Sequence, residues 1–159
     1  MPGPARGGPV SSFLAAFLAT VPLITGCGTS SNPAESCKVL SQINLPGDPQ
    51  VVSLLGAAGY HDCLIGYETD PEKADTLRLQ GRLEALKGTM LIRMKSPTAE
   101  SLRTRIVSAS DLNTLLGFFY LLKTSGTFSE ADVKKLDETF PHLQIADALH
   151  NYEQRPSPH

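Results

Sequence analysis

The chain has 159 residues, of which 41% are hydrophobic and 19% charged, and this balance is typical of one small globular domain with short appendages. The formal net charge is −2, from 14 basic and 16 acidic side chains, so the chain lacks the excess of positive charge that marks nucleic-acid-binding domains. No apolar run reaches the roughly 20 residues that a membrane-spanning helix needs.

The first 26 residues have the pattern of an export signal. Residues 1–12 carry a single charge, on Arg6, and an apolar stretch follows from Phe13 to Ile24. This stretch has the size expected of a signal peptide and is too short to cross a bilayer as a helix. It leads into Leu23-Ile24-Thr25-Gly26-Cys27, in which an aliphatic residue and small residues precede a cysteine.

This segment resembles the lipobox of bacterial lipoproteins. In that family the cysteine is joined to diacylglycerol, the preceding peptide is removed, and the new N-terminus is acylated. The resemblance implies that residues 1–26 are a cleaved signal peptide, that Cys27 is the lipidation site and joins the protein to membrane lipid, and that residues 27–32 form a flexible tether. Because Gly28 rather than Asp follows the cysteine, it also implies the outer membrane, facing the periplasm. An ordinary secretory signal or a buried N-terminal helix is the alternative.

Residues 33–152 are expected to form one helical domain, and residues 153–159 a disordered tail. The expected helix starts share one signal, a capping side chain followed by proline at the first helical position, where no N–H partner is needed. This signal occurs at Asn32-Pro33, Asp48-Pro49, Thr69-Asp70-Pro71-Glu72 and Ser96-Pro97, with a weaker version at Ser129-Glu130-Ala131-Asp132.

Apolar residues recur every three to four positions after these starts, as in amphipathic helices. A helix over about residues 71–94 is predicted from the stripe of Leu79, Leu83, Leu86 and Met90. Residues 112–122 are apolar on nearly all sides, which predicts a central helix covered by the others. A buried strand at 115–122 is the competing interpretation, but no second segment alternates with period two. The sequence therefore predicts an all-α fold, a small bundle of about five to six helices.

If Cys27 carries lipid, Cys37 and Cys63 remain, and an even remainder in an exported protein indicates a disulfide. Cys37 lies one turn into the first expected helix, and Cys63 follows the second, which is expected over residues 51–60. The bond would therefore join a helical hairpin across residues 44–47. Closing a loop of this length stabilises a protein by about 3–4 kcal/mol in the chain-entropy model.

A cysteine nucleophile is the functional alternative, because His61 and Asp62 directly precede Cys63. Neighbours at i, i+1 and i+2 do not face one another on a helix, which argues against it. His142 and His150 lie eight residues apart on one expected helix and are interpreted as surface polar residues. Residues 56–59, Gly-Ala-Ala-Gly, are expected to form a helix C-cap or a close helix contact rather than a phosphate loop. We therefore expect no enzymatic activity, metal site, cofactor or small-molecule substrate.

Positive charge is concentrated in the middle of the chain. A solvated surface is the simplest explanation, and a basic face around Arg78 and Arg82 is the candidate partner-binding surface. Such a face would meet anionic headgroups or an acidic segment of a partner. The basic residues in question are Lys73, Arg78, Arg82, Lys87, Arg93, Lys95, Arg103 and Arg105.

In architecture the chain is similar to pilotin lipoproteins, which escort secretin subunits of secretion and pilus machines to the outer membrane. No pilotin motif aligns residue by residue, so no site is carried over. The first hypothesis is a non-enzymatic assembly or scaffold factor of the envelope, which holds a partner's amphipathic segment between its helices. The second is a protective lipoprotein of the immunity or surface-exclusion type, which binds a protein partner. An envelope enzyme is the third, and the converging catalytic groups it requires are not evident in the sequence.

Overall fold

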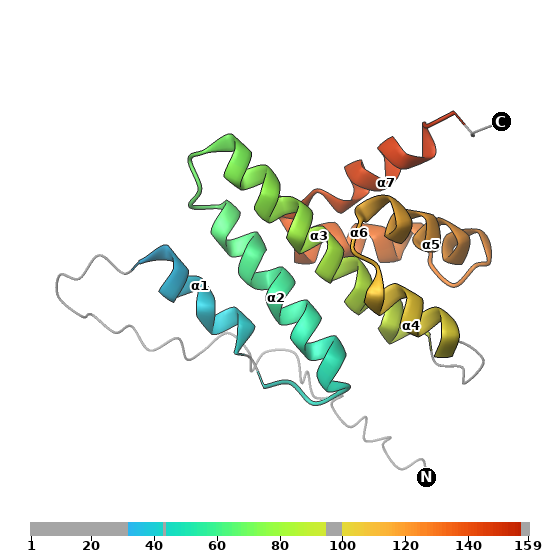
Figure 1. Ribbon diagram of the computed structural model, residues 1–159, viewed down its shortest axis with the longest axis horizontal. Helices are drawn as coiled ribbons and strands as arrows, with labels where there is room; N and C mark the ends of the chain where they lie inside the picture. The colour runs from blue at the N-terminus through green and yellow to red at the C-terminus, as the bar shows by residue number, and fades with distance from the viewer. Residues whose placement is uncertain (1–31, 43, 95–99, 157–159) are drawn as a thin grey trace, which may run out of the picture. The chain divides into compact units, whose positions relative to one another are not determined.

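The computed structural model describes residues 32–42, 44–94 and 100–156, which form seven α-helices and one 3₁₀ turn (Figure 1). No strand occurs in these residues, so the all-α prediction is confirmed, with slightly more helices than the expected five to six. The expected signal peptide, Cys27 and the helix start at Ser96-Pro97 lie outside the described residues. In chain order the elements are α1 (Pro33–Ser41), α2 (Pro49–Ile65), α3 (Pro71–Arg93), α4 (Glu100–Ser108), α5 (Leu112–Thr124), α6 (Glu130–Thr139), η2 (Pro141–Leu143) and α7 (Ile145–Glu153).

Side-chain caps begin the helices where the sequence predicts them. Asn32, Asp48 and Asp70 each accept the backbone N–H two residues ahead, at 3.1, 2.9 and 3.0 Å. Ser129 and Asp132 form a complete capping box at the start of α6. These bonds satisfy N–H groups that have no partner within their own helix, and each such cap typically contributes about 1 kcal/mol.

Helices α2 and α3 form a hairpin and share the most extensive interface among the described elements. Two glycines of α3 allow neighbouring elements to approach closely, Gly88 for α2 and Gly81 for η2. A Cβ placed on Gly88 would lie 2.7 Å from Leu55 Cδ2 of α2, and one on Gly81 would lie 2.5 Å from Leu143 Cδ2 of η2. Carbon atoms that are not bonded pack at about 3.5–4.0 Å, so neither position has room for a side chain.

The buried face of α3 differs from the leucine stripe expected from the sequence. Leu79 is 45% exposed, although it belongs to that stripe. The residues that are buried instead include Gly81, Ala85 and Gly88, which bring neighbouring elements close to the helix backbone. The spacing of leucines therefore predicted the helix correctly but placed part of its buried face wrongly, because small residues form the contact.

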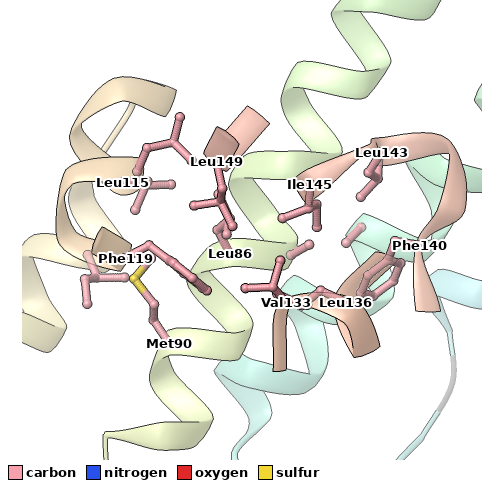
Figure 2. Packing of buried hydrophobic residues seen from close by; sticks show 14 of the residues in the cluster. Leu86, Met90, Leu115, Phe119, Val133, Leu136, Phe140, Leu143, Ile145 and Leu149 are labelled. Carbon is pink, nitrogen blue, oxygen red and sulfur yellow. The ribbon is translucent and has the colours of Figure 1, made fainter. Parts of the chain in front are cut away.

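A single cluster of buried apolar side chains joins α3 to α5 and to the C-terminal elements (Figure 2). The Phe119 and Phe128 rings stack inside it with centroids 4.5 Å apart. This cluster fixes α6, η2 and α7 against α3. Its labelled members in Figure 2 are Leu86, Met90, Leu115, Phe119, Val133, Leu136, Phe140, Leu143, Ile145 and Leu149.

A disulfide between Cys37 and Cys63 joins α1 to α2, which confirms the predicted pairing. Cys37 is fully buried and is the single buried residue of α1. A Cβ on Gly56 of α2 would lie 3.3 Å from the Leu40 carbonyl oxygen of α1, so the two helices also touch closely here. The disulfide and this tight backbone contact both hold α1 against α2.

Two details of α2 differ from expectation. The helix continues to Ile65 instead of ending near residue 60, so Cys63 lies within it rather than after it. The Gly-Ala-Ala-Gly segment at residues 56–59 is interior to α2, so it is a close helix contact and not a C-cap. The longer helix is consistent with the sequence after residue 60, which contains no proline or glycine until Gly66.

Replacing Gly81 by alanine is expected to destabilise the protein by about 1–3 kcal/mol, because the new Cβ would overlap the fully buried Leu143. Gly59→Ala is the matched control. A Cβ at Gly59 would meet its nearest atom at 3.8 Å, and an interior helical alanine is favoured over glycine by up to about 1 kcal/mol. Urea unfolding followed by circular dichroism measures both variants. Equal unfolding midpoints for the two variants would contradict the close-contact explanation.

Candidate functional site

An apolar groove of about 710 Å³ is open along α2. It is lined by α2, by the end of α1 and the α1–α2 loop, and by the C-terminal ends of α3 and α6. A smaller cavity of about 230 Å³ shares Leu55, Ile92, Thr139 and Phe140 with it and extends along α6 past Lys135 to Asp132. The two cavities are adjacent parts of one surface feature, which is called the groove below.

Apolar side chains around the groove are left in contact with water. Leu45 of the α1–α2 loop is 55% exposed and Ile92 of α3 is 46% exposed, and Leu40 of α1 is exposed as well. Burying apolar surface is favourable by about 25 cal/mol per Å², and a concave surface that gathers such side chains marks a binding site. The groove is therefore the candidate functional site.

Along α2, the wall of the groove is low at its middle because two of the lining residues are glycines. Gly56 and Gly59 both line it and contribute no side chain. A Cβ on Gly59 would lie 3.8 Å from Leu40 Cβ and 4.0 Å from Phe140 Cε1, so α1 and the end of α6 approach this position. The lining residues of α2 extend from its cap Asp48 to residue 62, which is about 21 Å of helix at 1.5 Å per residue.

Most charges at the rim of the groove are paired within the protein. Asp48 pairs with Arg103, and Asp132 pairs with Arg93. The backbone N–H of Gln50 and then the Arg103 side chain lower the pKa of Asp48, so its carboxylate is ionised at neutral pH. The described charged groups near the groove are thus largely paired with one another, so the groove offers mainly apolar side chains for contact.

The predicted basic face has contacts of its own in the structure. Arg78 Nε donates to the His142 carbonyl at 3.1 Å, and Arg82 donates through Nε to the Leu143 carbonyl and through a terminal nitrogen to the Gln144 carbonyl at 3.2 Å. Burial and then the charge of Arg78 lower the pKa of Arg82. Both arginines therefore hold η2 and the start of α7 against α3. Partner binding by this face stays a prediction, and reversing either charge would also disturb the fold.

The His61-Asp62-Cys63 sequence does not assemble a nucleophile with its base. His61 Nδ1 lies 2.6 Å from Glu84 Oε2, and Asp62 accepts the backbone N–H of His142 at 2.9 Å while its other oxygen lies 3.0 Å from the His142 ring. Cys63 is occupied by the disulfide. The three neighbours therefore bind three separate partners, and each of them joins α2 to another element.

His142 and His150 do not share a helix, contrary to the sequence-based expectation. His142 lies in η2 and His150 in α7, and Gln144 in the left-handed conformation (φ 53°) separates the two elements. In the described parts of the chain, no group of three or more His, Cys, Asp or Glu side chains is arranged to hold a metal ion. No helix there has the length and apolar character to cross a membrane.

Comparisons of the chain with protein-family models, with curated proteins and with solved structures find no match.

The stability of the fold is expected to decrease as the pH falls below about 5. Hydrogen bonds lower the pKa of Asp48, Asp111 and Asp132, with ion pairs to arginine contributing for Asp48 and Asp132. A carboxylate with a lowered folded pKa contributes stability above its unfolded pKa of about 4. That contribution is lost as the pH falls through the folded value.

Asp132→Asn tests this explanation of the pH dependence. The variant should be less stable than the parent at pH 7 and should lose less stability on acidification, because one of the three carboxyl groups with a lowered pKa is gone. Urea midpoints measured between pH 7 and pH 2 give both quantities. Superimposable pH profiles for parent and variant would rule out a contribution from Asp132.

Proposed function

We propose that the protein is a non-enzymatic lipoprotein of the bacterial envelope, anchored through Cys27, that binds an amphipathic helix of a partner protein in its groove. The observation that carries the proposal is the groove along α2, where the lining residues Leu45 and Ile92 remain exposed and Gly56 and Gly59 contribute no side chain. Grooves of this kind receive the apolar side of a partner helix. In role the protein would be an assembly or scaffold factor, similar to a pilotin, for a secretion system or pilus.

The position of the groove suits a protein held at a membrane by its N-terminus. The expected tether ends at Asn32, which lines a separate cavity with Leu64 and Tyr67 at the C-terminal end of α2. The groove is centred around Leu55, about 14 Å farther along α2. Six extended residues between Cys27 and Pro33 reach at most about 20 Å. A tether of this length would keep the Asn32 end of the domain close to the outer membrane, and the groove lies farther along α2 from that end.

Lipidation of Cys27 is tested by metabolic labelling with an alkyne fatty acid. Wild-type protein should be labelled and found in the membrane fraction, whereas Cys27→Ala should lose the label and be released. Buried acyl chains contribute about 0.8 kcal/mol per CH₂, so their loss removes stable attachment. The double variant Cys37→Ala/Cys63→Ala is the control and should keep its label. A labelled Cys27→Ala protein would disprove the anchor.

Partner binding is tested by crosslinked pull-down of the lipoprotein from intact membranes. A subunit of an envelope machine, such as a secretin, should be recovered with the wild-type protein. Ile92→Asp should reduce its recovery about tenfold or more, because a charge would be placed on the apolar contact surface. Leu121→Asp is the matched control, since Leu121 is 63% exposed on α5 and lies outside the groove.

Equal recovery with Ile92→Asp and Leu121→Asp would exclude the groove as the binding site. The recovered protein also distinguishes the two non-enzymatic functions. A component of the cell's own envelope machine supports an assembly factor, whereas an incoming toxin or conjugation protein would replace this proposal with a protective lipoprotein.

A further inference from the structure

Lys135 of α6 is a cation at the rim of the groove that lacks a counter-charge among the described residues. Its side chain is exposed and lines the smaller cavity, beside Thr139 and Ile92. No ion pair or hydrogen bond of its ammonium group occurs within the described part of the chain. The adjacent Lys134, in contrast, lies 3.8 Å from Glu138 on the same helix.

Arg93 and Asp48 at the rim differ from Lys135 because each has a counter-charge, whereas Asp62, which also lines the groove, is held by His142. Arg93 is paired with Asp132 in the same cavity, and Asp48 is paired at the loop end of the groove. A helix laid over the groove would cover these pairs without leaving a charge unbalanced. Covering Lys135 without a counter-charge would instead carry a desolvation penalty, which a carboxylate on the partner would offset.

We infer that the groove selects an amphipathic helix with an acidic side chain on the flank that faces α6, where it meets Lys135. This inference rests on the proposed function and specifies the partner's chemistry. The 21 Å of α2 that line the groove correspond to about fourteen residues of a bound helix, or four turns. The apolar stripe of that helix would cover Ile92 and Leu45, and its acidic flank would lie over α6.

Synthetic peptides provide a defined probe for this inference. Two fluorescent 14-residue helical peptides share one leucine stripe and differ only in their flanking positions, which are glutamate in one peptide and glutamine in the other. Binding to the full-length acylated lipoprotein, reconstituted in nanodiscs of neutral lipid, is measured by fluorescence anisotropy. The glutamate peptide should bind about two- to fivefold more tightly at low salt, and the difference should shrink at 0.5 M salt.

The variants assign this preference to one side chain. Lys135→Gln should abolish the preference for glutamate. Lys135→Glu should instead favour a third peptide, which has the same leucine stripe and lysine at the flanking positions. Lys134→Gln is the matched control and should leave the preference unchanged, because Lys134 is outside the groove lining. All three substitutions are at exposed positions of α6, so the fold is expected to tolerate them.

The outcomes separate this inference from the proposed function. Equal binding of both peptides, or a preference for glutamate that survives in Lys135→Gln, overturns the acidic-flank inference. Groove binding itself still stands in that case if Ile92→Asp weakens the binding of the peptides. Failure of both peptides to bind overturns the inference as well, and the pull-down with Ile92→Asp then decides the proposed function independently. Neither peptide would bind if the groove were already occupied by lipid or by a second copy of the chain.

Discussion

The close contact of α3 with its neighbours at Gly81 and Gly88 determines where the rest of the described structure lies. Because Gly81 has no side chain, Leu143 fits against the backbone of α3, so η2 packs on α3 and α6 ends beside η2. Because Gly88 has no side chain either, Leu55 of α2 fits against α3 there, and Leu55 also lines the groove. The packing that stabilises the core therefore also shapes one side of the candidate binding surface, because α6 and the end of α3 form that side.

The opposite side of the groove depends on a covalent bond. Helix α1 buries a single residue, Cys37, and its disulfide to α2 keeps Leu40 and the following loop beside the groove. Loop closure of this size contributes about 3–4 kcal/mol, a large share of the net stability of a small domain. Such a bond persists in oxidising compartments, which agrees with the envelope location proposed from the N-terminal sequence.

Local signals in the sequence predicted the helices, and the cysteine count predicted the disulfide, whereas the other contacts between distant segments escaped prediction. Capping at Asn32, Asp48 and Asp70 is local, so the helix starts could be predicted from neighbouring residues. The structural role of Arg82 depends on carbonyls more than 60 residues away, and a basic residue alone does not indicate them. Leu45 and Ile92 resemble core residues in the sequence, and only the fold shows that they remain exposed.

The groove along α2 is proposed to hold a helix of an envelope protein. Site-specific photocrosslinking in intact cells tests it most directly, with a photoreactive amino acid in place of Ile92 of the full-length lipoprotein and, in parallel, in place of Leu121. Groove binding predicts a crosslink from position 92 to one amphipathic segment, mapped by mass spectrometry, and no such crosslink from position 121. Crosslinks from position 92 to lipid alone, or the same products from both positions, would contradict the claim.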